Sequence, residues 1–227
     1  TRSSLYLRIE ETGMDGEDWE KLWREVKTAQ HQKGYQQAYR SMEAAAKDTE
    51  GEMLFYGSKV CEGVFHRISS GATRDGLEVF GKMEKGYLLS VDSNWDMYGE
   101  GYLSGHYFSE EALRKQLEKA YPGLVFTEES PEKQINMYKR DKVGHILSLT
   151  VGNKTISGEE FRKLLELPSS NFTMQAADGK IRFLCKGQGH GLGLSQYGGN
   201  VLAKEGKSYK EILRYYFPEC GVQKKDS

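Results

Sequence analysis

Residues 187–199, GQGHGLGLSQYGG, combine six glycines with one histidine, one serine, two glutamines and one tyrosine. A glycine-rich backbone can approach a ligand or another segment closely, because no Cβ stands in the way. Imidazole, hydroxyl and amide groups next to such a backbone can donate and accept hydrogen bonds. We therefore expect a turn from a strand to a helix, with His190, Ser195, Gln196 and Tyr197 along its exposed side.

The glycine spacing argues against three common sites. A dinucleotide-binding fingerprint would need a further glycine where Leu192 or Leu194 stands. A phosphate-binding P-loop ending at residues 206–208 would need its first glycine at Val201. A nucleophile elbow around the serine would need glycine at Tyr197. Nucleotide binding and serine hydrolysis are therefore disfavoured.

The residues alone leave structural roles open for both histidines of interest. His190 could only bridge backbone carbonyls inside a tight turn, and His66 could be a core histidine at a strand end. His66, His106 and Cys61 do not have the fixed spacing of a metal site. We expect neither a metal nor another cofactor.

The three cysteines, Cys61, Cys185 and Cys220, are widely spaced and form no C-x-x-C pair. Their odd number fits two situations. Either the protein works in a reducing compartment, or one disulfide leaves one free thiol.

Charge and hydropathy exclude further classes. The chain of 227 residues has 33 acidic and 32 basic side chains, so nothing predicts nucleic acid as a partner. No apolar run approaches the roughly 20 residues of a membrane-spanning helix. The chain begins at Thr1 without an initiator methionine, so we expect that an upstream part has been removed.

Hydrophobic periodicity and capping signals predict a mixed α+β fold. Ser157 with Glu160 and Ser208 with Glu211 have the capping-box spacing, and Ser109 can cap a helix with Ala112, Leu113, Leu117 and Ala120 facing inward. Helices are predicted at residues 18–29, 35–49, 109–123, around 201–202 and from 209. Strands are predicted within 52–68 with a turn at Gly57-Ser58, at 86–93, in a hairpin over 144–157, and at 179–187. We expect a single mixed domain over residues 1–227, and the sequence leaves open whether this domain has two lobes.

The C-terminal part resembles the signature of the stage II sporulation protein D family. Residues 187–218, GQGHGLGLSQYGGNVLAKEGKSYKEILRYYFP, follow its pattern of roughly G-x-G-H-G-V-G-M-S-Q-Y-G-A and A-x-x-G-x-x-Y-x-E-I-L-x-x-Y-Y-P. Residues 1–8, 48–81, 86–93 and 154–174 are similar to other family segments in the same order. Ala72 and Gly199 stand where the family commonly has glycine and alanine, and Gly144-His145 replaces a common Gly-Arg.

This resemblance implies a lytic transglycosylase. Such an enzyme breaks the bond between N-acetylmuramic acid and N-acetylglucosamine without adding water, because the 6-hydroxyl of the muramyl sugar attacks its own anomeric carbon. One carboxyl group first acts as the acid and then as the base. The family's essential glutamate precedes the helix that Arg2 ends, so it falls before Thr1, and we expect no catalytic residue within this chain. The positions that match the family motifs, and so are expected to bind substrate, are Arg2, His66, Ser69, Ser70, His190, Ser195, Gln196 and Tyr197.

Other roles for charged residues remain open. Arg2 could be a surface cation beside Glu10 or Glu11, and we expect both of these glutamates to be solvated rather than catalytic. Asp92 and Asp96 are better candidates for supporting carboxylates.

The resemblance also implies a setting. We expect an extracytoplasmic protein, tethered to a membrane by an anchor that this chain lacks, with denuded peptidoglycan strands as substrate. Other proteins of the engulfment machinery are candidate partners. The alternative is a non-catalytic cell-wall binding protein or an amidase enhancer.

Overall fold

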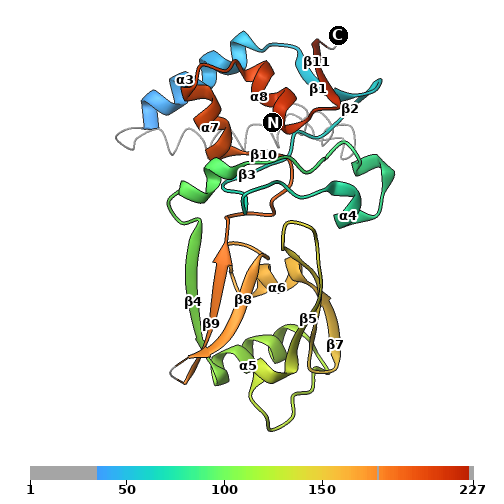
Figure 1. Ribbon diagram of the computed structural model, residues 1–227, viewed down its shortest axis with the longest axis vertical. Coiled ribbons are helices and arrows are strands. Elements are labelled where there is room, and N and C mark those ends of the chain that lie inside the picture. Colours follow the sequence, from blue (N-terminus) through green and yellow to red (C-terminus); the bar gives the residue numbers. More distant parts are fainter. Residues whose placement is uncertain (1–34, 178, 225–227) are drawn as a thin grey trace, which may run out of the picture. The chain divides into compact units, whose positions relative to one another are not determined.

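The computed structural model describes residues 35–177 and 179–224 (Figure 1). The chain divides into two compact units, one formed by residues up to Val64 together with those from Glu219, and the other by Phe65–Pro218. Helices and small sheets occur in both, which confirms the mixed α+β class. A single domain over 1–227 stays a prediction. Arg2 and the helix predicted at 18–29 lie outside the described residues.

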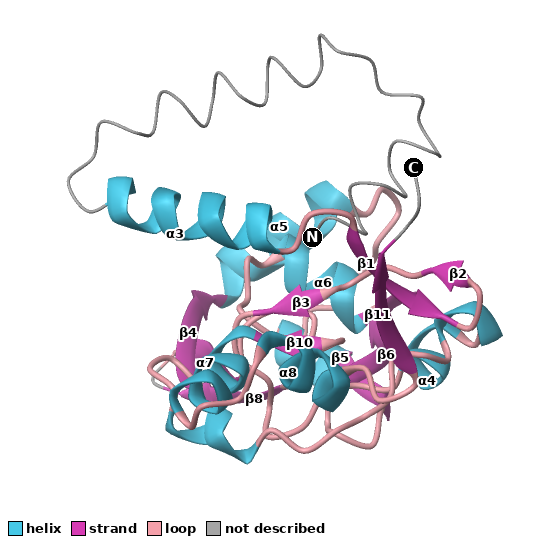
Figure 2. Ribbon diagram, turned by 90° about the horizontal axis from the view of Figure 1, so that it is seen from above, coloured by secondary structure: helices cyan, strands magenta, loops and turns pink. Residues whose placement is uncertain are grey.

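The first unit contains one helix and one antiparallel sheet. Its strand order is β11-β1-β2, and Figure 2 shows β11 alongside β1. Gly57, with φ 59°, makes the turn between β1 and β2, as the sequence predicts. The elements are α3 (Tyr35–Asp48), β1 (Glu52–Tyr56), β2 (Lys59–Val60) and β11 (Cys220–Lys224).

The larger part of the second unit is built from two three-stranded antiparallel sheets and two helices. The sheets have the orders β4-β9-β8 and β5-β6-β7, and Figure 1 shows α6 between them. Phe161, Phe172 and Phe183 meet in the core with ring centroids 5.4–5.8 Å apart. The bounds are β4 (Leu103–Ser109), α5 (Glu110–Ala120), β5 (Ile135–Arg140), β6 (Ile146–Val151), β7 (Lys154–Ser157), α6 (Gly158–Leu164), β8 (Phe172–Ala177) and β9 (Lys180–Lys186).

The α5 prediction is only partly right. Ser109 caps this helix by accepting the backbone N–H of Ala112, and Leu113 and Leu117 are fully buried. Ala112 and Ala120 are exposed, so the inward face is narrower than predicted. The capping box of Ser157 before α6 is present as predicted.

The remaining elements of the second unit include those that flank the glycine-rich turn, whereas η3 packs against α5, β5, β6 and β8. Strand β10 pairs with β3 in parallel, although more than a hundred residues separate the two along the chain. No helix in the described part of the chain is long and apolar enough to cross a membrane. The bounds are β3 (Phe65–His66), α4 (Gly76–Phe80), η1 (Met83–Lys85), η2 (Asn94–Tyr98), η3 (Pro131–Gln134), β10 (Leu194–Ser195), α7 (Gln196–Lys204) and α8 (Tyr209–Tyr216).

The strand predicted at 86–93 is wrong. Only an isolated bridge joins Ala72 and Asp92 there. Thr73 explains the difference, because its hydroxyl donates to the Leu89 carbonyl and accepts the N–H of Val91. The apolar run is buried and hydrogen-bonded, but partly by a side chain rather than by a strand ladder.

Candidate functional site

The glycine-rich segment forms the predicted turn from strand β9 to helix α7. Gly189 and Gly191 have φ 108° and 77°, a backbone region that side chains disfavour. Space is as restrictive as the backbone angle. A Cβ on Gly189 would lie 2.8 Å from the Cβ of His66, and one on Gly191 would lie 2.9 Å from Cδ of Arg74. The glycines therefore let the turn pack directly on these two side chains.

Leu192, within this turn, holds two histidines through its backbone. The Nδ1 atom of His66 is 3.0 Å from the Leu192 carbonyl oxygen, which can only accept, so Nδ1 carries a proton. The Leu192 N–H donates to Nδ1 of His190 at 3.1 Å. The two rings meet edge to face with centroids 5.8 Å apart. One residue of the turn thus orients both imidazoles.

Both imidazoles are poor bases in this environment. Burial lowers the pKa of His66 to about 4, although its hydrogen bond to the Leu192 carbonyl opposes the shift. Burial also lowers the pKa of His190, while the negative charge of Glu159 raises it. The Nε2 atom of His66 is buried and has no hydrogen-bond partner among residues 35–177 and 179–224. At neutral pH the pair is therefore uncharged.

Asp96, on η2, links two of the predicted site residues. Its fully buried carboxylate accepts the Ser69 N–H at 2.8 Å and the Ser195 hydroxyl at 2.9 Å. The Ser195 oxygen in turn accepts the N–H of Gly198 and caps α7. The prediction that Ser195 lines the exposed side of the turn is wrong, because it is fully buried and serves as a helix cap. Asp96 supports the site as a hydrogen-bond acceptor.

A second polar chain runs from Ser70 to a buried ion pair. The Ser70 hydroxyl lies 3.3 Å from Nε2 of His145, whose Nδ1 lies 3.0 Å from the Ser170 hydroxyl. The backbone N–H of His145 donates to the carboxylate of Asp141, which also pairs with Arg74 at 2.5 Å. Burial, followed by the Arg74 charge, holds the pKa of His145 well below its usual range. This series of hydrogen bonds keeps Ser70 in a fixed position.

Arg74 connects this chain to the glycine-rich turn. Its guanidinium donates to the His190 carbonyl at 3.1 Å, and its backbone N–H donates to the carbonyl of Gly191 at 2.8 Å. Sequence reasoning missed Arg74, Asp141 and Ser170. Arg74 lies inside residues 48–81, which resemble the family, and this resemblance was the one signal that could have identified it. Asp141 lies 67 residues from Arg74 along the chain, so no local pattern links the two.

The accessible part of the site is smaller than the set of predicted residues. Gln196 is exposed at the first position of α7, while Tyr197, Ser70 and His190 are half-buried. The Tyr197 N–H donates to the Arg67 carbonyl at 3.1 Å. His66, Ser69 and Ser195 lie beneath this surface and are buried. The structure thus divides the predicted residues into a buried support and an accessible row.

Carboxylates and metal ligands near the turn are limited. No group of three or more His, Cys, Asp or Glu side chains in the described ranges could hold a metal ion. Asp92 is exposed, and its backbone carbonyl accepts the Tyr215 hydroxyl at 2.7 Å. Glu159 pairs with Arg162 at 2.6 Å and is the carboxylate whose charge acts on His190. The buried side chains around the turn therefore act through hydrogen bonds.

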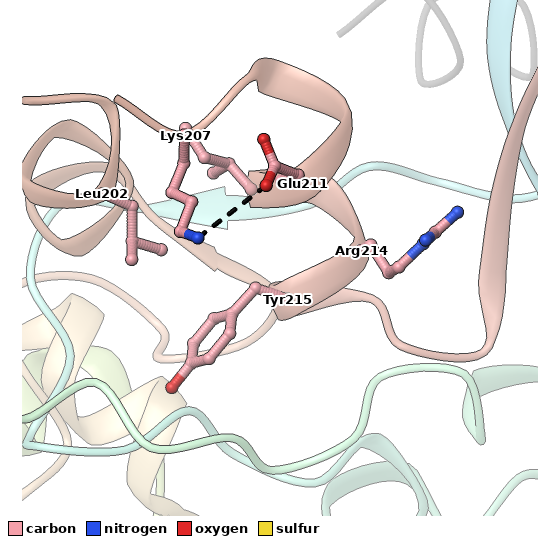
Figure 3. Close-up of a pocket in the computed structure, with 6 residues that line it drawn as sticks. Leu202, Lys207, Glu211, Arg214 and Tyr215 are labelled. Atoms are coloured by element: carbon pink, nitrogen blue, oxygen red, sulfur yellow. Dashed lines mark ion pairs between the residues drawn. The ribbon is translucent and has the colours of Figure 1, made fainter. Parts of the chain in front are cut away.

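A hollow of about 280 Å³ lies elsewhere in the second unit (Figure 3). The exposed ion pair between Lys207 and Glu211, 3.8 Å apart, lies along it. None of its lining residues belongs to the glycine-rich turn, so its position does not define the site. They are Leu202, Lys207, Glu211, Ile212, Arg214 and Tyr215.

Comparison with known proteins identifies relatives of most of the chain. No protein-family model matches. Stage II sporulation protein D of Bacillus amyloliquefaciens is 30% identical over 193 residues, which are 85% of this chain and 54% of that protein. The Bacillus subtilis protein of the same name is 27% identical over 194 residues, with the same two shares. An amidase enhancer of Bacillus subtilis is 42% identical over 50 residues, which are 22% of this chain and 7% of that protein.

The chain spans about half the length of the two sporulation proteins that it matches. Within this chain, however, their similarity covers 85% of the residues. This is the family whose motifs the sequence resembles in five separate segments. The chain belongs to the stage II sporulation protein D family.

Proposed function

We propose that the protein is a lytic transglycosylase of sporulation. It would cleave the bond between N-acetylmuramic acid and N-acetylglucosamine in denuded peptidoglycan strands and release 1,6-anhydro products. The observation that carries this proposal is the similarity to stage II sporulation protein D over 85% of the chain. An extracytoplasmic setting, an anchor outside this chain and partners in the engulfment machinery belong to the same proposal.

The residues of this chain would bind and orient the sugar rather than transfer its protons. The exposed Gln196 amide carries both a donor and an acceptor, as an acetamido group requires. Ser70 and His190 offer further polar atoms beside it, and Tyr197 offers an aromatic face. Holding the muramyl 6-hydroxyl close to the anomeric carbon would speed the reaction, because binding then supplies part of the entropy cost of bringing the two together. The acid and base would be the glutamate that the resemblance places before Thr1.

Mass spectrometry of the products tests this proposal. The protein with its natural upstream residues is incubated with purified denuded strands, and the products are compared with those of a hydrolase. Anhydro products would be lighter by one water, about 18 Da, because the sugar's own hydroxyl replaces water as the nucleophile. The 227-residue chain alone serves as a comparator and is expected to be inactive. Hydrolytic products, or no cleavage by the longer protein, would overturn the proposal.

A matched pair of variants tests the role of the accessible row. Gln196→Ala removes the exposed amide at the start of α7 and is expected to slow cleavage about tenfold, the worth of one hydrogen bond in the transition state. Asn200→Ala removes another exposed amide one turn later and is expected to leave the rate unchanged. Both variants should have the same melting temperature as the unchanged protein. Equal rates for the two would exclude Gln196 from substrate binding.

A second candidate function is a non-catalytic wall-binding protein or amidase enhancer. The 50-residue similarity to an amidase enhancer favours it. Under this alternative, strands would pull the longer protein down and stay intact. Adding it to a peptidoglycan amidase would then raise the rate at which stem peptides are released.

A further inference from the structure

Two cysteines of the first unit meet over one face of strand β1. The backbone N–H of Cys61 donates to the Leu54 carbonyl at 2.9 Å, and Cys220 on β11 is paired with Tyr56. Leu54 and Tyr56 are two positions apart on β1, so their side chains point to the same face. The Sγ atoms of Cys61 and Cys220 are 3.6 Å apart. These two residues are thiols in this structure.

We propose that Cys61 and Cys220 are a covalent modification site and form an intramolecular disulfide when the protein meets a disulfide oxidant. A disulfide bond is about 2.05 Å long, so the sulfurs must approach by about 1.5 Å. Side-chain rotation and a small shift at the start of β11 can supply this movement. The inference does not rest on the proposed function and holds whether or not the protein cleaves glycan.

The environment of the pair sets the order of the steps. Cys220 is half-buried and Cys61 is buried, so an oxidant reaches Cys220 first. The pKa of Cys220 is lowered because the Cys61 thiol donates a hydrogen bond to its sulfur. The Cys220 thiolate attacks the oxidant's disulfide and releases one of its thiols. Cys61 then loses its proton to solvent, attacks the Cys220 sulfur and releases the second thiol.

Cys185 provides an internal contrast. It is fully buried on β9 of the second unit, and burial raises the pKa of its thiol to about 11. A protonated, inaccessible thiol reacts slowly in exchange. The sequence left open whether one disulfide leaves one free thiol, and this geometry points to Cys185 as the free one.

The bond would also close a long loop. Cys61 and Cys220 are 159 residues apart, and the whole second unit lies between them in the chain. Closing a loop of this length restricts the unfolded chain and stabilises the folded one. We expect the melting temperature of the oxidised protein to be about 5–15 °C above that of the reduced protein.

Peptide mapping under non-reducing conditions tests the proposal. The full chain is equilibrated with excess oxidised glutathione, unfolded, alkylated and digested with trypsin. Residues 60–67 and 215–224 should then appear as one linked species, about 2 Da lighter than the sum of the two peptides, because two hydrogens leave with the oxidant. Dithiothreitol should restore both thiols and lower the melting temperature again.

Single variants provide the controls. Cys185→Ala should retain the linked species, and Cys220→Ala should lose it. Should Cys220→Ala not fold, the map of the unchanged chain decides by itself. The proposal is overturned if Cys61 and Cys220 are both alkylated after oxidation, if each carries glutathione, or if the link joins two copies of the chain.

Discussion

The second unit contains two interiors that are equally buried and chemically opposite. One is the apolar core around Phe161, Phe172 and Phe183. The other is the polar interior beneath the glycine-rich turn, which includes Asp96 and the pair of Arg74 and Asp141. Apolar burial is non-directional and tolerates swaps that conserve volume. A buried polar group depends on each of its partners, so the polar interior should respond far more sharply to small changes.

The largest effect is expected from Asp141→Asn, which leaves the Arg74 charge buried without its counter-charge. Breaking such a pair by removing one partner costs about 3–5 kcal/mol in the free energy of unfolding, which urea titration measures. Lys207→Ala breaks the exposed pair with Glu211 and should cost far less, because solvent screens both charges. The double replacement Arg74→Met with Asp141→Leu should recover part of the loss. A cost below about 1 kcal/mol for Asp141→Asn would contradict a desolvated pair.

The second effect depends on pH. Because the His66 pKa falls from 6.5 to about 4 on folding, the unfolded chain binds a proton that the folded chain does not. Stability is therefore complete above about pH 6.5 and is lost as the pH falls toward 4, by about 3 kcal/mol from this residue. The lowered pKa values of His145 and His190 act in the same direction.

Urea titrations at several pH values between 7 and 4 measure this loss. His66→Phe should be less stable at pH 7 but show a shallower dependence on pH. Ile181→Val, a change in the apolar core, should shift the curve without changing its slope. An unchanged slope in His66→Phe would show that His66 does not titrate as proposed.

The third comparison sets a small change in the polar interior against a small change in the apolar core. Asp96→Asn replaces one acceptor oxygen by a donor, so Ser69 or Ser195 loses its buried partner, at about 1–3 kcal/mol. Ile181→Val removes one methylene from the apolar core, at about 0.5–1.5 kcal/mol. Thermal melting compares them directly. The contrast between the two interiors fails if Ile181→Val is the more costly change.

The smallest effect is a gain. Gly199 lies inside α7, and an added Cβ would make ordinary contacts of 3.6 Å with Ile212 and Leu194. Gly199→Ala should therefore stabilise the protein by about 0.4–1 kcal/mol, because alanine restricts the unfolded chain. Gly198→Ala is the matched control, since its Cβ would collide with the Tyr216 hydroxyl and should destabilise. Calorimetry that finds both changes destabilising would contradict this packing.

The sequence predicted well those elements that depend on neighbouring residues. Both capping boxes, at Ser157 and Ser208, are present in the structure, because their partners lie three residues away. The turn at Gly57 and the glycine-rich turn were also predicted from local backbone requirements. Strand β4 was missed, because it pairs with β9 far along the chain. Strand β8 was also missed, although it pairs with β9 across a short turn, with Ala177 opposite Lys180.

The sequence predicted which residues gather at the candidate site, but not which of them are buried. His190 and Ser195 are only five positions apart, yet one is half-buried and the other completely buried. Burial there depends on Asp96, which is 99 residues from Ser195, and no local pattern encodes such a partner. His190 accepts the backbone N–H of Leu192 in its own turn, whereas the structural role left open by the sequence was a bridge between backbone carbonyls.

The short parallel pairing of β3 with β10 has a consequence for the kinetics of folding. The hydrogen bond from His66 to Leu192 spans 126 residues, so the loop between them must close before the site exists. Contacts of such long range form slowly and late. On the ribosome, His66 on β3 would be synthesised long before β10, the strand with which β3 pairs. The candidate site would then form only after the C-terminal part of the unit had been synthesised.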